Sequence, residues 1–149
     1  FRFVSWIGPG YSHGVIFDFY KKLVNCDKNL EILGDGLQKK SFLDVDDGVA
    51  AILQLSKHGE KSQIFNLGHE EIMSVKVLAD IVCSFLNLKN VKYLYSGSNR
   101  GWIGDSPMVH LDISKAKEKG WTPTISIKEG IHRTLNYLKN KDNLLRTCN

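Results

Sequence analysis

The chain has 149 residues, of which 42% are hydrophobic and 24% are charged, and these proportions exclude a disordered or fibrous protein. This length is enough for about one domain with a sizeable core. Twenty basic against sixteen acidic residues give a net charge of +4, which suits a small acidic ligand but is too weak and too scattered to indicate a nucleic-acid partner.

Cysteine and histidine positions show no pattern typical of a metal site. The three cysteines, Cys26, Cys83 and Cys148, lack a C-x-x-C spacing, which favours reduced thiols in a cytoplasmic protein. The five histidines form no pair at metal-ligand spacing, so we expect no metal. A membrane span needs a run of about 18 apolar residues; the sequence has none, and we expect no membrane partner.

The chain begins without a methionine, inside the apolar, strand-like stretch FRFVS, and we expect it to be a piece of a larger protein. Apolar runs and helical spacings then alternate, divided by glycine, proline and capping residues. Elements are predicted in this order: strand 1–5, helix 15–25, strand 30–33, strand 42–45, helix 46–57, strand 63–67, helix 74–86, strand 91–95, helix 112–120 and helix 126–139. The alternation predicts a mixed α/β fold.

The helix predicted over 46–57 is defined by its two ends and one apolar face. Asp46 is a typical N-cap residue, and Gly59 follows the last turn. Val49, Ile52 and Leu53 have the helical spacing of a buried face. We therefore expect these three side chains to point into the core.

Capping residues also mark the starts of three later helices. Ser74 can cap the helix that it precedes, and Asp112 can cap a short helix that Gly120 ends. Ser126 and Glu129 fit the capping box S-x-x-E, in which each side chain satisfies the backbone N–H of the other residue.

Lys39 and Lys40 follow a Gly34-Asp35-Gly36 turn, and two interpretations of them are open at this point. Backbone N–H groups of such a turn point outward, and a cation beside them can add attraction for a phosphate. Lysines are also common on solvated surfaces. The pattern alone leaves both the anion-binding and the surface interpretation open.

In the glycine-rich loop 97–107, three side chains likewise allow both a ligand-binding and a structural interpretation. Arg100 could bind an anion, because loops on rigid scaffolds often carry function. Trp102 is costly in a loop unless it packs or stacks on something, and Asp105 could cap or accept from a ligand hydroxyl. The loop contains G-x-x-x-G-x-x-G after a strand, but no amphipathic helix follows it, so we do not expect a dinucleotide loop here.

Six motifs succeed one another along the chain: RFVSWIGPG, HGVIFDF, LEILGDGLQKKSFLDVDD, FNLG, RGWIGD and LDISKAKEKGWTP. In this order the chain closely resembles the C-terminal half of the extended short-chain dehydrogenase/reductase family. Within it, the chain is most similar to NAD-dependent sugar-nucleotide epimerases and dehydratases, especially UDP-glucose 4-epimerase-like proteins. The segment GDG-x-Q-x-(R/K)-x-F-x-x-V-x-D is the most specific part of the resemblance.

The resemblance implies a site for a nucleoside-diphosphate sugar. Ser5 stands where the family usually has an asparagine near the diphosphate. His13, Gly14 and Val15 begin the segment that wraps the nucleotide base. Leu33 stands where an aromatic or aliphatic group stacks on that base.

Three charged residues complete the implied site, and the chain departs from the family pattern around them. Lys40 occupies the position of an arginine that binds the diphosphate, and a lysine offers a point charge instead of a bidentate fork. Arg100 and Asp105 resemble a pair that clamps phosphate and ribose, but Trp102 fills the usual arginine position. Ile7 replaces a common tyrosine, which leaves the role of that position open.

The implied fold is α/β: a small substrate-binding domain plus strands and a helix detached from a parent Rossmann-type doubly wound sheet. The whole chain, 1–149, would be the C-terminal substrate-binding part of a larger enzyme. Residues 1–9 and about 43–68 would contribute to the parent nucleotide-binding layer. Separated from that layer they would expose apolar faces, so we expect self-association.

The implied activity is that of an NAD-dependent epimerase, a cytoplasmic homodimer in its full-length form. In this family the cofactor loop and the catalytic tyrosine and lysine lie upstream of the segment that Phe1 begins. The resemblance thus implies no catalytic or cofactor-binding residue here, and neither tight NAD binding nor turnover by the chain alone. Tyr137 and Lys141 match Y-x-x-x-K, but only at the end of the last predicted helix, without the framework that such a pair needs.

Other functions remain open. Dehydratase, decarboxylase or reductase chemistry would use the same substrate site. A non-catalytic nucleotide-binding module of the same fold is a second possibility. A structural or partner-binding domain is a third, and it would leave Lys40 and Arg100 as ordinary surface residues.

Overall fold

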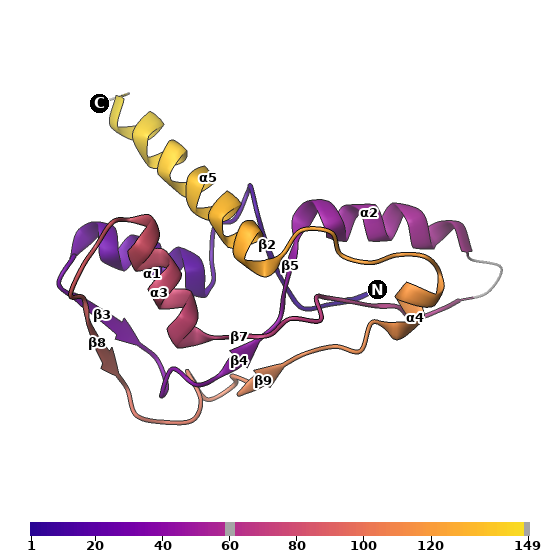
Figure 1. The fold of residues 1–149 in the computed structure, drawn as a ribbon, viewed down its shortest axis with the longest axis horizontal. Coiled ribbons are helices and arrows are strands. Elements are labelled where there is room, and N and C mark those ends of the chain that lie inside the picture. The colour runs from indigo at the N-terminus through magenta and orange to yellow at the C-terminus, as the bar shows by residue number, and fades with distance from the viewer. Residues whose placement is uncertain (59–61, 148–149) are drawn as a thin grey trace.

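The computed structural model describes residues 1–58 and 62–147, and it has the mixed α/β class that the sequence predicts (Figure 1). The helices are α1 (Val15–Asn25), α2 (Val45–Leu55), α3 (Val75–Phe85), α4 (Ser114–Glu118) and α5 (Ile127–Thr147), and the 3-10 turn η1 (Ser56–His58) follows α2. The strands are β1 (Arg2–Phe3), β2 (Ser5–Ile7), β3 (Asn29–Ile32), β4 (Lys39–Lys40), β5 (Phe42–Asp44), β6 (Asn66–Leu67), β7 (Met73–Ser74), β8 (Lys92–Tyr95) and β9 (Met108–Val109).

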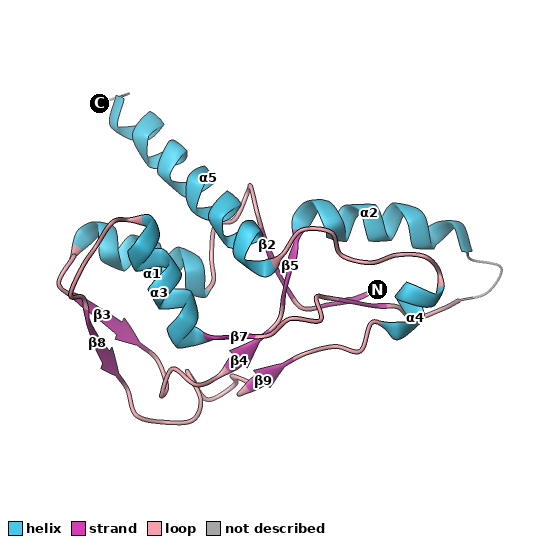
Figure 2. Cartoon of the chain, viewed as in Figure 1, coloured by secondary structure: helices cyan, strands magenta, loops and turns pink. Residues whose placement is uncertain are grey.

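Within the described residues the strands form four small sheets, joined by long loops (Figure 2). β1 pairs with β6, β2 with β5, and β3 with β8, and all of these pairs are parallel. β4 lies between β7, which is antiparallel to it, and β9, which is parallel. Because parallel strands need a crossover connection, each of these pairs joins segments that are far apart in the sequence.

Two hydrophobic cores hold the described elements together. The first core is built mainly from α1, α3, α5 and β3, and its members include Ile16, Phe19, Leu23, Leu30, Ile32, Leu78, Val82, Ile131 and Leu135. The second core is built around α2, β6 and α4: Val4, Leu43, Ala51, Leu55, Phe65, Leu67, Ile113, Ala116 and Trp121. Since successive side chains of a strand point to opposite faces, Phe42 of β5 packs in the first core and Leu43 in the second.

The helices of the first core form where the sequence predicts them. α1 buries Ile16, Phe19 and Leu23, which recur at helical spacing, and burying each such side chain contributes about 1.5–3 kcal/mol. The predicted cap of α3 is confirmed, because the Oγ of Ser74 accepts a hydrogen bond from the backbone N–H of Val77 at 3.3 Å.

The predicted start and inner face of α2 are wrong. Asp44, not Asp46, is the N-cap, and its Oδ1 accepts a hydrogen bond from the backbone N–H of Asp46 at 3.0 Å. Val49 and Leu53, which were expected to face the core, are 45% and 63% exposed, and Ile52 is only partly buried.

The indole of Trp6 explains which face of α2 is buried. Ala51 and Leu55 are buried, and Gly48 lies so close to the indole of Trp6 that a Cβ added there would be 2.7 Å from it. The side of the helix that meets β2 therefore carries small residues. The predicted end of this helix, Gly59, lies outside the described residues.

The capping predictions for the later helices hold in part. The N-cap of α4 is Ile113 and not the predicted Asp112, although the Oδ1 of Asp112 accepts from the backbone N–H of Ser114 at 2.9 Å. The Oγ of Ser126 accepts from the backbone N–H of Glu129 at 3.2 Å, as predicted. α5 continues to Thr147, well past the predicted end near residue 139, and its C-terminal half extends away from the rest of the chain (Figure 1).

Aromatic side chains lie beside the second core in a row of ring contacts. Phe1 stacks on Phe65 with 6.0 Å between ring centroids, and Phe3 meets Trp6 edge-on at 5.0 Å. We call Phe65, Phe1, Phe3 and Trp6 the aromatic row. Phe1 and Phe3 are 45% and 44% exposed, so this part of the chain does leave apolar surface uncovered. The self-association expected from it stays a prediction.

Within the described ranges, no helix combines the length and apolar character needed to cross a bilayer. In the same part of the chain, no three His, Cys, Asp or Glu side chains are grouped so that they could hold a metal ion. Cys83 is a buried free thiol and Cys26 an exposed one, while Cys148 lies outside the described residues.

Candidate functional site

A cavity of about 420 Å³ lies where the start of α1, the strands β4 and β5, and the loop between β8 and β9 come together. Because β9 pairs with β4, the β8–β9 loop is brought back beside the Gly34-Asp35-Gly36 turn (Figure 2). We call this the main cavity. Its walls combine apolar groups with a few charged and amide side chains, which is the usual composition of a small-molecule site.

Six of the eight residues that the family resemblance selects line the main cavity: Ser5, Gly14, Val15, Leu33, Lys40 and Asp105. His13 lies at a neighbouring cavity of about 350 Å³, which shares Ser5, Tyr11 and Gly14 with the main one. Among the described residues that line the main cavity, the β8–β9 loop contributes Gly101 and Trp102 rather than Arg100. The structure thus gathers most of the predicted residues, and places His13 and Arg100 beside the group.

The charge of Lys40 is already paired within the protein. Its Nζ lies 2.5 Å from the Oδ1 of Asp105 and 2.5 Å from the carbonyl oxygen of Ser106, and both side chains of the ion pair are only 16% exposed. The other oxygen of Asp105 accepts from the backbone N–H of Gly101 at 3.1 Å. Burial acts to raise the pKa of Asp105, but the hydrogen bonds from Lys40 and Gly101 outweigh it and hold that pKa below its ordinary value.

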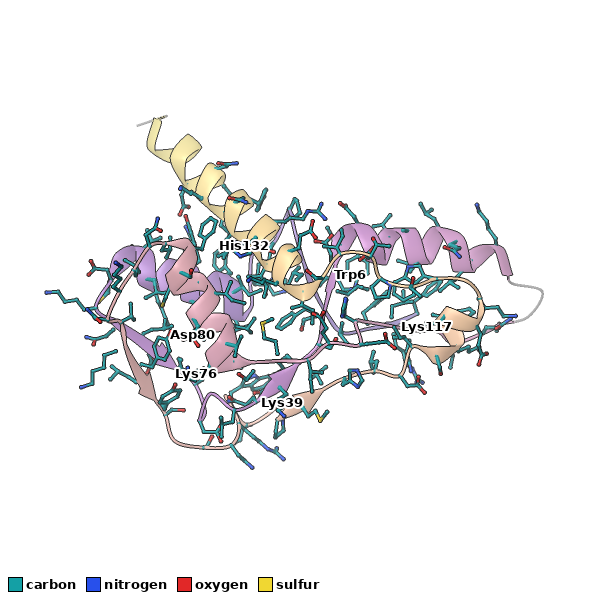
Figure 3. The ribbon with its side chains drawn as sticks, in the orientation of Figure 1. Trp6, Lys39, Lys76, Asp80, Lys117 and His132 are labelled. Carbon is teal, nitrogen blue, oxygen red and sulfur yellow. The ribbon has the colours of Figure 1, made fainter. Side chains whose placement is uncertain are left out.

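The pleat of β4 separates the two lysines that the sequence left undecided. Adjacent residues of a strand point to opposite faces, so Lys40 turns into the cavity while Lys39 is exposed. Lys39 lies on β4, near the paired strand β9 (Figure 3). The surface interpretation therefore fits Lys39, and the position of Lys40 fits a role in binding an anion.

The Gly34-Asp35-Gly36 turn makes room for a buried amide that the sequence analysis did not select as a site residue. Gly34 has a positive φ of 87°, and a Cβ there would lie 1.8 Å from the Nε2 of Gln38, so only glycine fits. Gln38 is 3% exposed and lines the main cavity. One signal could have found it, because residues 38 and 40 are two apart in an extended segment and therefore share a face.

Tyr11 is a second residue that the sequence analysis missed. It lines both cavities, and burial raises the pKa of Tyr11 to about 12, although the nearby backbone N–H of Ile16 acts to lower it. Gly14, the N-cap of α1, has no side chain to serve the first turn of that helix. The Tyr11 hydroxyl lies close to Gly14, where an added Cβ would be 2.3 Å from it.

A buried carboxylate joins the strands beside the cavities to α5. Asp44 is 2% exposed, and its Oδ1 accepts from Nη1 of Arg133 at 2.8 Å. Burial raises the pKa of Asp44, although its hydrogen bond from the backbone of Asp46 and the charge of Arg133 act against the rise. Nearby, the hydroxyl of Thr134 accepts from the backbone N–H of Gly8 at 2.7 Å. These contacts fix the Gly8-Pro9-Gly10 loop that borders the neighbouring cavity.

The fold and the cavity together define the class of protein. Parallel strand pairs with helical crossovers, and cavities at the loops that follow the strands, are the architecture of α/β proteins that bind small molecules beside a doubly wound sheet. The solved structure of a UDP-galactose 4-epimerase has this fold, with a TM-score of 0.78 and 30% sequence identity over 94% of this chain and 44% of that chain. An epimerase from Methanothermobacter thermautotrophicus gives a TM-score of 0.82 with 25% identity, over 98% of this chain and 44% of that chain.

The family follows from the sequence match. Residues 1–68 match the NAD dependent epimerase/dehydratase family, and the UDP-glucuronate 4-epimerase of Thermodesulfobacterium geofontis is 32% identical over 98% of this chain and 44% of its own length. The resemblance to the C-terminal half of NAD-dependent sugar-nucleotide epimerases and dehydratases is therefore confirmed. The chain spans less than half the length of the curated relatives it matches.

Proposed function

We propose that this chain is the sugar-nucleotide-binding portion of an NAD-dependent nucleoside-diphosphate-sugar epimerase, with the dehydratases of the same family as the alternative. One observation carries the proposal. The main cavity collects Ser5, Gly14, Val15, Leu33, Lys40 and Asp105 from segments scattered over the chain, and the family motifs had assigned these residues to one ligand.

Within this proposal, Lys40 binds the diphosphate and Asp105 acts as its partner until the ligand arrives. A diphosphate carries more negative charge than one carboxylate, so it competes well for the ammonium at the same distance. Asp105 is then free to accept from a ribose hydroxyl, while the backbone N–H of Gly101 still holds its other oxygen. Leu33 and Val15 give the apolar wall that a nucleoside needs.

The cofactor of the full-length protein is proposed to be NAD, held by residues outside these 149. The glycine-rich loop 97–104 follows β8 but leads to β9 and not to a helix, so its amides do not gather at a helix N-terminus as a dinucleotide pyrophosphate requires. NAD would supply the hydride chemistry of the full-length enzyme, which we propose to be a cytoplasmic homodimer. The chain described here would orient the sugar nucleotide.

Calorimetric titration with UDP-glucose, dTDP-glucose and GDP-mannose tests the binding proposal. At least one of them should bind saturably. Lys40→Ala should weaken that binding by tenfold or more, because it removes the ammonium from the cavity, whereas Lys39→Ala, a change at the exposed neighbour on the same strand, should leave it unchanged. Absence of saturable binding for all three nucleotides, or equal effects of the two substitutions, would contradict the proposal.

The position of the cofactor site is tested separately with NAD itself. We expect no firm, saturable binding of NAD to the 149-residue chain in the same calorimeter. Firm binding would place the cofactor site within these residues and contradict our assignment. A full-length protein that binds UDP-glucose but has no epimerase or dehydratase turnover would instead be a non-catalytic nucleotide-binding module.

A further inference from the structure

A separate cavity of about 530 Å³ lies between the C-terminal end of α3 and the start of β8, and we call it the α3–β8 cavity. Its lining includes no residue of the main cavity and none that the family resemblance selects. Val75, at the start of α3, borders the main cavity, whereas Cys83 borders this one. Because an α-helix rises about 1.5 Å per residue, the two positions are about 12 Å apart along α3. The α3–β8 cavity is therefore a different place on the molecule.

The charges around the α3–β8 cavity favour an uncharged ligand. Asp80 on α3 is already paired, since its Oδ1 accepts from the hydroxyl of Tyr93 at 2.7 Å and its Oδ2 accepts from Nζ of Lys76 at 3.0 Å (Figure 3). An anion in the cavity would lie at the C-terminal end of α3, where the helix dipole is negative. A cation would lie beside the ammonium of Lys89, which lines the cavity. Neither sign of charge is favoured there.

Two asparagines and a serine supply the polar part of the wall. Ser84, Asn87 and Asn90 line the cavity, and all three residues are exposed, so a ligand can reach them. An amide side chain and a hydroxyl each donate and accept hydrogen bonds. The uncharged ligand groups that match such a wall are hydroxyl groups, because they too both donate and accept.

Apolar groups form the rest of the wall. Leu88, Val91 and Tyr93 line the cavity from the edge of the first core. Burial, together with the hydrogen bond to Asp80, raises the pKa of Tyr93, so its hydroxyl stays protonated. An apolar, partly aromatic surface beside amides and a hydroxyl matches a pyranose ring, whose C–H groups pack against such a surface while its hydroxyls form hydrogen bonds.

We propose that the α3–β8 cavity is a second ligand site and binds an uncharged hexose, with hydroxyls of the sugar hydrogen-bonded to Asn87 and Asn90. This inference does not depend on the proposed function, because the two cavities share no residue. The asparagines have a competing explanation: their φ values are 56° and 62°, a left-handed conformation that asparagine adopts more readily than most residues. Glycine separates the two explanations, since it adopts a positive φ readily but has no amide.

NMR titration of the isotope-labelled chain with D-glucose, D-galactose and D-mannose tests the site. At least one hexose should shift the amide signals of residues 84–93 saturably and leave those of the main cavity in place. The uronate and the amino sugar derived from that hexose should bind about fivefold more weakly, because their charge has no partner in the cavity. No saturable shift in residues 84–93 with any of the three hexoses overturns the site. Equal binding of a charged derivative overturns the assignment of an uncharged ligand.

Two substitutions assign the binding to the amides. Asn87→Gly and Asn90→Gly retain the positive φ, so the circular dichroism spectrum should be unchanged. Each should weaken hexose binding about fivefold, the scale of one lost hydrogen bond. Asn99→Gly, the same change in the exposed loop after β8, should leave the affinity unaltered. Full affinity in both cavity variants would show that the asparagines serve the backbone alone and would overturn the assignment, as would an equal loss in Asn99→Gly.

Discussion

The two cores of this chain differ in the side chains that lie exposed beside them. In the first core, helices α1, α3 and α5 surround their contacts, and Leu78, Ile131 and Leu135 are fully buried. Beside the second core, Phe1 and Phe3 of the aromatic row remain nearly half exposed. Both cores contain closely packed aliphatic residues, so the difference lies in the outer layer and not in the interior.

The comparison indicates which exposed apolar surface could contact another protein surface. Exposed apolar side chains that cluster on one face, such as the aromatic row, are typical of a surface that binds another surface. The first core supports the main cavity, and the aromatic row beside the second core is a candidate contact surface. That residues 1–9 and about 43–68 belong to a larger layer stays a prediction.

The largest expected effect is on the free energy of unfolding, measured for one leucine from each region. Leu78→Ala should lower the free energy of unfolding by about 2–5 kcal/mol, because the side chain is fully buried and its removal leaves a cavity. Leu53→Ala on α2, where the leucine is 63% exposed, should change it by less than about 0.5 kcal/mol. Urea unfolding followed by circular dichroism measures both. Equal losses would show that α2 is covered in solution and that the contrast is wrong.

The next effect concerns the carboxylate that ties α2 to the segment before α5. Asp47 accepts hydrogen bonds from the backbone N–H groups of Thr124 and Ile125 at 2.9 and 2.8 Å and from the hydroxyl of Thr124 at 2.8 Å. Asp47→Ala should cost about 3 kcal/mol in the same unfolding measurement, because it removes three hydrogen bonds to a buried, charged acceptor.

Asp46, the neighbour of Asp47 on α2, is the matched control for Asp47→Ala. Asp46 forms an exposed ion pair with Arg133, and such pairs contribute less than about 1 kcal/mol. Asp46→Ala should therefore be the milder change. A larger loss for Asp46→Ala than for Asp47→Ala would mean that α2 is anchored through Arg133 instead.

Self-association gives a third comparison, again between matched residues. Phe3 of the aromatic row and Leu94 of β8 are 44% and 43% exposed, but only Phe3 lies beside the second core. If the aromatic row is the contact surface, Phe3→Ser should raise the dissociation constant of self-association about tenfold, since it removes apolar area from the interface. Leu94→Ser should have no effect. Sedimentation equilibrium measures both, and a clean monomer at high concentration of the unaltered chain would count against the prediction.

The sequence predicts the fold well where apolar residues recur at helical spacing over several turns. α1 and α3 have this spacing, and Ser74 marks the start of α3. The inner face of α2 could not be predicted, because it depends on the indole of Trp6, which strand pairing brings against Gly48. β4, β7 and β9 have two residues each, too few for an alternating pattern to be visible.

The site was predictable as a set of residues but not as a geometry. The motifs select Lys40 and Asp105 separately, yet their ion pair joins residues 65 positions apart, so the neutralised state of Lys40 has no local signal. Gln38 stands inside the most specific motif, but its place in the cavity wall depends on the room that Gly34 leaves for its amide. Side-chain pairing across loops is set by tertiary contacts, which composition and spacing do not encode.

The smallest effect isolates the ion pair of the main cavity. Asp105→Asn should lower the free energy of unfolding by about 1 kcal/mol at pH 7, the scale of a partly exposed, charge-assisted contact. Because the pKa of Asp105 in the fold lies below its ordinary value of 3.8, its contribution is present above pH 3.8 and is lost as the pH falls through the lower, folded pKa. The difference between the unaltered chain and Asp105→Asn should thus shrink below about pH 4.

Binding should respond to Asp105→Asn in the opposite direction to stability. With the carboxylate removed, the ammonium of Lys40 faces the cavity uncompensated, and inorganic pyrophosphate should bind more tightly than to the unaltered chain. Asp80→Asn is the control, since Asp80 pairs with Lys76 within α3 and is not among the residues that line the main cavity. Calorimetry at pH 7 decides the point: weaker pyrophosphate binding by Asp105→Asn would show that the carboxylate orients Lys40 for the anion more than it competes with it.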